Sequence, residues 1–100
     1  MYILIKEGVP DKFAPVIAAH ASLACYKKYE KEGEMQDWFD HSFKKVVCKV
    51  NSGAFEKAKE AGKCVIMTES ALDGQEVGLA FCPRSVYPKG FQFFSMWKPI

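Results

Sequence analysis

Hydrophobic residues fall into short runs separated by polar segments that contain glycine and proline, a pattern typical of a mixed α/β protein. Four runs rich in β-branched and aromatic residues predict strands at residues 2–7, 43–50, 63–69 and 76–83. Between them, apolar residues recur at helical spacing, which predicts helices at residues 12–33, 34–42 and 51–62. The pattern therefore alternates strand and helix until the last two strands.

The order of these elements predicts a three-layer α/β/α domain with a four-stranded mixed sheet. Helices join the first three strands, and connections of that kind favour parallel strands. Residues 70–75 are too few for a crossover helix, so we expect the third and fourth strands to be antiparallel neighbours. Because no internal repeat or linker interrupts the pattern, residues 1–100 are predicted to form a single domain.

The first long helix carries the residue of greatest chemical interest. We expect Asp11 to cap its start and Gly33 to end it. One apolar stripe is expected to face the sheet, made of Phe13, Val16, Ile17, His20, Leu23 and Ala24. His20 within that stripe has two interpretations: a partly buried histidine with one hydrogen-bond partner, or a general acid or base at the mouth of a cleft.

Polar residues at the end of the third predicted strand are the candidate partners of His20. Glu69 closes that strand between Thr68 and Ser70, whose hydroxyls could donate hydrogen bonds. The alternative is that these three residues are simply a polar strand end. Ser22 and Cys25 do not share the helix face of His20, so we favour water activated by an acid/base pair over a covalent nucleophile.

Composition narrows the partners and the location. The net charge is +2, and Arg84 is the only arginine among 14 basic residues, so any contact with RNA should be made by lysines to phosphates. Lys45 and Lys49 should share one face of the strand at residues 43–50. No apolar run is long enough to span a membrane, and residues 1–8 lack a basic leader, so we expect a cytoplasmic location.

The four cysteines are widely spaced, which predicts buried, reduced thiols. His41 could join them in a metal site, but no ligand spacing supports one, so we expect no metal site. The tail after residue 83 is rich in aromatic rings, among them Phe91, Phe93, Phe94 and Trp97. These rings either complete the core, which we favour, or form a partner surface that could hold a homodimer.

Four segments together resemble the type 2 peptidyl-tRNA hydrolases over residues 2–83: AAHASLACYK, KKVVCKVN, FEKAKEAG and CPR. The resemblance implies an α/β/α fold that hydrolyses the ester between a peptide and tRNA without a cofactor. His20 matches the histidine of that family, and Glu69 is nearest to its aspartate. The family's lysine position is Phe13 here, with Lys12 beside it.

The resemblance implies His20, Glu69 and Lys12 as catalytic residues. From their positions in the sequence, Thr68 and Ser70 beside Glu69, and Lys45 and Lys49 on one strand face, are expected to bind the substrate. The alternative is a module that keeps the fold without the chemistry and binds tRNA or a protein.

Overall fold

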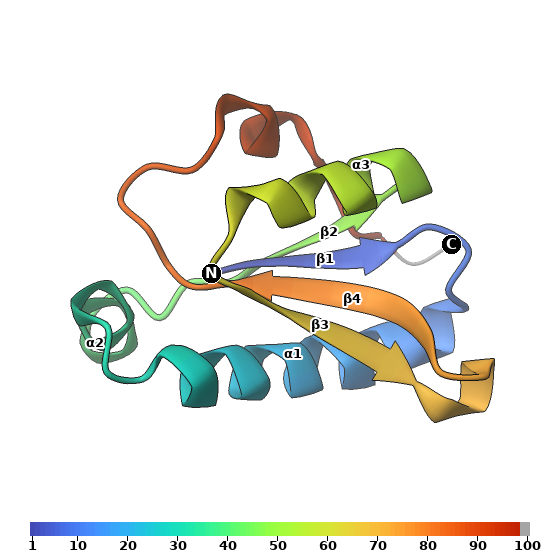
Figure 1. The fold of residues 1–100 in the computed structure, drawn as a ribbon, viewed down its shortest axis with the longest axis horizontal. Coiled ribbons are helices and arrows are strands. Elements are labelled where there is room, and N and C mark those ends of the chain that lie inside the picture. The colour runs from blue at the N-terminus through green and yellow to red at the C-terminus, as the bar shows by residue number, and fades with distance from the viewer. Residues whose placement is uncertain (99–100) are drawn as a thin grey trace.

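The computed structural model describes residues 1–98, which form one five-stranded sheet with helices on both faces (Figure 1). The strands are β1 (Tyr2–Lys6), β2 (Val46–Val50), β3 (Cys64–Glu69), β4 (Gln75–Phe81) and β5 (Ser95–Met96). The helices are α1 (Ala14–Tyr29), α2 (Gly33–Asp40) and α3 (Ser52–Ala58), and short 3-10 turns are η1 (Asp11–Phe13), η2 (Lys59–Ala61), η3 (Ser70–Leu72) and η4 (Lys89–Phe93).

The strand order is β3-β4-β1-β2-β5, and it confirms the predicted α/β class and the predicted pairings. β1 and β2 are parallel, whereas β3 and β4 are antiparallel neighbours. The predicted count of four strands was wrong, because β5 pairs antiparallel with β2. β5 has only two residues, too few to show an alternation of apolar and polar side chains, so periodicity does not predict this strand.

The sheet separates two cores. In Figure 1, α1 covers one face, and α3 with η4 covers the other. β1 supplies both cores in alternation: Ile3 and Ile5 belong to the α1 side and Leu4 to the α3 side. All three are buried, so β1 is the central strand of the fold by burial as well as by pairing.

The rotation of α1 about its axis differs from the prediction. Its buried residues are Ala14, Ile17, Ala21 and Cys25. Val16 and Leu23 are 49% and 69% exposed, and His20 is also exposed, so the expected stripe was wrong at these positions. The helix has apolar residues on almost every side, so its own periodicity does not determine which side meets the sheet.

A close contact with the sheet determines that rotation. Gly78 of β4 lies so near Ile17 that a Cβ at Gly78 would be 2.8 Å from Ile17 Cγ2. The absence of a side chain at Gly78 lets α1 approach the sheet there, with Ile17 at the contact.

The structure changes two of the predicted helix ends and confirms a third. α1 begins at Ala14 without a side-chain cap, and Asp11 lies in η1 instead, where its carboxylate pairs with Lys49. The predicted cap was therefore wrong: the long-range ion pair holds Asp11. Gly33 opens α2, because α1 already ends at Tyr29. Asn51 does cap α3, accepting a hydrogen bond from the Ala54 N–H at 2.8 Å.

The aromatic tail packs mainly on its own chain. Phe91 is buried, and Phe94 and Trp97 lie half-buried against the two cores, which confirms the core interpretation for these three rings. Phe93 remains 79% exposed. The last two residues of the tail, 99 and 100, lie outside the described residues. Within residues 1–98, no helix has the length and hydropathy needed to cross a bilayer.

Replacing Gly78 with alanine should destabilise the protein. The added methyl group would press on the branched side chain of Ile17 and lie 3.4 Å from the Leu4 carbonyl oxygen. We expect the free energy of unfolding to fall by about 1–3 kcal/mol, measured by urea denaturation. Gly90→Ala is the matched control, because nothing lies within 4 Å of its Cβ position. Equal stability of the two variants would contradict the close contact.

Candidate functional site

His20 lies on the outer half of the side of α1 that faces β3. Along that side of the helix, Ala24 packs into the core and the Lys28 ammonium donates a hydrogen bond to the Cys64 carbonyl of β3 at 3.3 Å. The His20 ring is exposed and makes no hydrogen bond or ion pair with the other described residues. Its environment is therefore not that of a core histidine satisfied by one partner.

Glu69 points to the same side of the sheet as α1. Val65 and Met67 of β3 pack in the α1-side core, and Glu69 follows Met67 by two residues on the same strand. A bulge interrupts the pairing of β3 and β4: Met67 pairs with Gly78 and Thr68 pairs with Glu76, which leaves Val77 of β4 without a partner. The extra residue is in β4, so the alternation of side chains along β3 continues unbroken to Glu69. Glu69 Oε1 accepts a hydrogen bond from the Ala71 N–H at 3.3 Å, which caps η3.

The two hydroxyl residues beside Glu69 are placed differently from each other. Thr68 pairs with Glu76, whose carboxylate binds Lys59 on the α3 side of the sheet, so Thr68 faces away from α1. Ser70 is exposed at the start of η3. His20, Glu69 and Ser70 thus come from elements on or near one side of the sheet, and Thr68 projects from the other.

Lys12 and Phe13 take opposite roles in the turn before α1. Phe13 is half-buried and packs against the α1-side core. Lys12 is exposed, with its Nζ 5.4 Å from the centre of the Phe13 ring. The ring therefore anchors the start of α1, while the ammonium group is directed to solvent.

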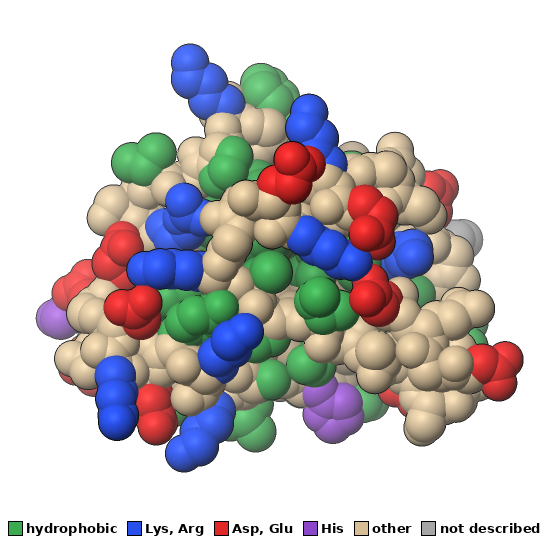
Figure 2. All heavy atoms as spheres, viewed as in Figure 1, with side chains coloured by type: hydrophobic (Ala, Val, Ile, Leu, Met, Phe, Trp, Pro, Cys, Tyr) green, Lys and Arg blue, Asp and Glu red, His purple; other side chains and the backbone are tan. Residues whose placement is uncertain are grey.

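Lys45 and Lys49 lie on the α1 face of the sheet, as alternation predicts. Lys49 Nζ is 3.5 Å from Asp11 Oδ1, and this ion pair joins the end of β2 to η1. Lys45 Nζ instead donates to the Phe43 carbonyl oxygen at 3.0 Å. Figure 2 shows acidic and basic side chains interspersed over the face in view, so the charge on it is mixed. Sequence reasoning missed the Asp11 contact, because 38 residues separate the partners.

The thiols are unsuited to nucleophilic attack. All four cysteines are free. Cys25, Cys48 and Cys82 are buried as predicted, whereas Cys64 is only half-buried. Burial raises the pKa of the Cys25 thiol to about 12, and it raises the pKa of the Cys64 thiol as well. Because the thiolate is the reactive form, a raised pKa disfavours a covalent cysteine mechanism.

In the described part of the chain, no group of three or more histidine, cysteine or acidic residues is placed to hold a metal ion. The candidate chemistry of this region therefore consists of one free imidazole, one carboxylate and nearby hydroxyl and ammonium groups.

Comparison with known families identifies a match over most of the chain. Residues 10–75 match the family described as peptidyl-tRNA hydrolase PTH2, a span that includes η1, α1, β2, α3 and β3. The chain belongs to this family. No curated protein matched the sequence. The PTH2 match covers His20, Glu69, Lys12 and Lys49, the residues on which the predicted chemistry depends.

The thiols should differ in reactivity in the folded protein. At pH 8, a short pulse of N-ethylmaleimide should label Cys64 before Cys25, because Cys25 is fully buried and its pKa lies about four units above that pH. Peptide mass spectrometry after the pulse identifies the labelled residue. The same pulse in concentrated urea serves as the control, in which both thiols should react. Rapid labelling of Cys25 in the folded protein would contradict the described core.

Proposed function

We propose that this protein hydrolyses the ester bond that joins a peptide or another acyl group to tRNA, in the cytoplasm. Membership of the PTH2 family supports a tRNA-related hydrolase in general terms. The observation that carries the more specific proposal is the His20 ring, which is exposed and free on the same side of the sheet as Glu69. A titratable ring without a structural partner is available for proton transfer.

In the proposed reaction, His20 accepts a proton from a water molecule as the water oxygen bonds to the ester carbonyl carbon. The bond from that carbon to the ribose oxygen then breaks, and the proton passes to the ribose oxygen. Glu69 supports the reaction through Oε2, since Oε1 already caps η3. Carboxylate negative charge beside an imidazole favours the imidazolium that forms.

Positive and hydroxyl groups around this pair supply the remaining roles. Lys12 and Ser70 are exposed and are proposed to stabilise the developing oxyanion. Thr68 faces the α3 side of the sheet, so we propose that it contacts the substrate only if the substrate extends to that side. Lys45 and Lys49 are proposed to contact phosphates; Lys49 must first leave Asp11.

The second candidate is a binding module that holds tRNA or a protein without turnover. Phe13 favours it, because this core ring stands where the resemblance implies a catalytic lysine. In either case the predicted homodimer through the aromatic tail would have to use Phe93, the ring left most exposed.

Removing the imidazole should slow turnover strongly. With N-acetyl-aminoacyl-tRNA as substrate, we expect His20→Ala to release free tRNA about one hundredfold more slowly than the unchanged protein. His41→Ala is the matched control, because His41 is the other histidine and is exposed at the end of α2. Equal loss in both variants would count against a role for His20. Binding without release by the unchanged protein would favour the module.

Binding of tRNA should weaken as salt rises. Each phosphate contact adds about minus one to the slope of log affinity against log salt, so Lys49→Ala should make that slope less negative by about one. Lys27→Ala is the control, since Lys27 is exposed at the far end of α1. The measurement is filter binding between low and physiological salt. An affinity that does not change with salt would exclude the phosphate contacts.

A further inference from the structure

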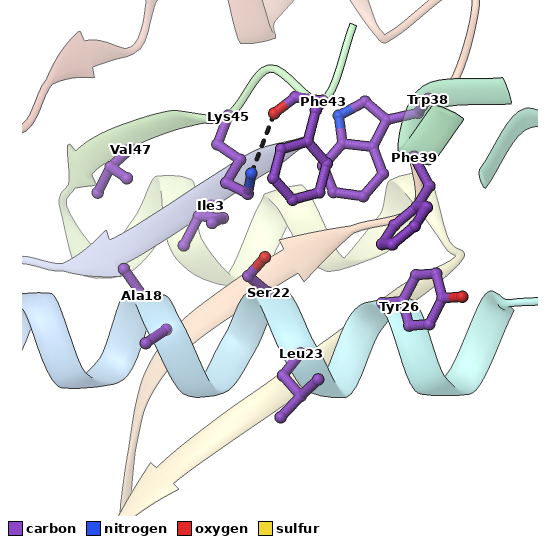
Figure 3. A pocket seen from close by; sticks show the side chains of 11 residues that line it. Ile3, Ala18, Ser22, Leu23, Tyr26, Trp38, Phe39, Phe43, Lys45 and Val47 are labelled. Atoms are coloured by element: carbon purple, nitrogen blue, oxygen red, sulfur yellow. Dashed lines mark hydrogen bonds between the residues drawn. The ribbon is translucent and has the colours of Figure 1, made fainter. Parts of the chain in front are cut away.

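A separate pocket opens on the side of α1 opposite His20. It has a volume of about 410 Å³ and lies between α1, α2 and the β1–β2 part of the sheet (Figure 3). Ala18, Ser22 and Leu23 line it from α1, Phe39 from α2, and Phe43 and Lys45 from the segment that leads into β2. At 100° of rotation per residue, Ser22 and His20 project about 200° apart around the helix, so the pocket opens away from His20, although it shares Lys45 with the proposed phosphate contacts.

Small residues keep this pocket open. Ala18 and Ser22 stand where α1 faces Ile3 and Val47 of the sheet, and neither is large enough to fill the space. Large apolar side chains surround the opening: Leu23 is 69% exposed, Phe43 is 49% and Phe39 is 46%. A cluster of exposed apolar residues around a concave surface is typical of a ligand site.

Charge in the pocket has one sign. Lys45 is the only charged residue among the described residues that line it. Its ammonium lies 3.2 Å from the centre of the Phe43 ring and donates to the Phe43 carbonyl, as Figure 3 shows. A lysine held by its own neighbours can exchange those contacts for an anionic ligand, because its stem is flexible.

The aromatic rings leave little room for a stacked nucleobase. Trp38 lies beside Phe43 at a centroid distance of 5.0 Å and a tilt of 34°, while Lys45 covers the Phe43 ring from within the pocket. Phe39 packs with Tyr26 at 4.8 Å. Stacking needs an open ring face, so this geometry favours an apolar group that enters the cavity over a base.

The Ser22 hydroxyl further restricts the chemical class of the ligand. Its side chain projects from α1 toward Lys45 and Phe43 in Figure 3 and has no hydrogen-bond partner among the described residues. A peptide amide could use that hydroxyl, whereas a fatty-acid chain could not.

We propose that this pocket binds the carboxyl-terminal end of a peptide with an apolar last residue, its side chain in the cavity and its carboxylate on Lys45. This ligand goes beyond the proposed hydrolysis but is consistent with it, because cleavage of the ester would release a peptide with such a carboxylate. Lys45 can bind either a tRNA phosphate, as proposed above, or this carboxylate, so tRNA and the peptide would compete for it.

N-acetylphenylalanine is the probe, and methyl NMR of the full chain is the measurement. We expect saturable shifts at Leu23 and Ala18, with N-acetylphenylalaninamide binding about tenfold more weakly because it lacks the carboxylate. Lys45→Met should lower affinity for the acid to that of the amide, whereas Lys27→Met should not change it. Ser22→Leu, which fills the cavity, should abolish the shifts.

The outcomes separate this proposal from the proposed function. His20→Ala protein should bind the probe with unchanged affinity, even if hydrolysis is lost. Equal binding of acid and amide would overturn the role of Lys45. Octanoate binding as tightly as N-acetylphenylalanine would indicate a lipid-type acid and overturn the peptide assignment. Shifts confined to other residues, or none at millimolar probe, would overturn the site itself.

Discussion

The close approach of α1 to the sheet at Gly78 decides which side of α1 carries His20 and which side borders the pocket. Because a Cβ at Gly78 would come within 2.8 Å of Ile17 Cγ2, the helix can approach this closely only in the absence of a side chain there. With Ile17 fixed against the sheet, the helical rotation of 100° per residue sets every other position. His20 then falls on the β3 side, and Ala18 and Ser22 fall on the β2 side. One packing contact therefore creates two different surfaces.

These two surfaces have different chemical character. On the β3 side, a free imidazole stands on the same side of the sheet as a carboxylate whose second oxygen is unused. On the β2 side, an apolar cavity carries one ammonium group at its edge. Proton transfer from water needs polar groups that water can reach, whereas recognition of an apolar side chain needs a concave apolar surface. A helix with small residues at these positions can border both, because alanine and serine occupy little of the space on either side.

The sequence predicted the elements and their pairing better than it predicted which residues face the core. Strand runs and connection lengths depend on local composition, so β1, β2, β3 and β4 and the β3–β4 hairpin could be predicted. The orientation of α1 could not, since Val16, Leu23 and Ile17 are equally apolar and only the sheet surface distinguishes them. Asp11 was misassigned for a similar reason: a short-range capping rule could not anticipate a lysine 38 residues away. Long-range contacts decided both cases.

Phe13 shows how the fold and the chemistry are connected. Its ring packs in the α1-side core, so a lysine at that position would have to give up this packing or carry its charge toward an apolar layer. The ammonium group that this turn does provide, on Lys12, is directed to solvent one residue earlier. In the proposed reaction, the positive charge from this turn would therefore come from the flexible side chain of Lys12 in η1 and not from a fixed position on α1. Such a group loses more conformational entropy when it is ordered, so the proposed reaction would depend more strongly on His20 and Glu69.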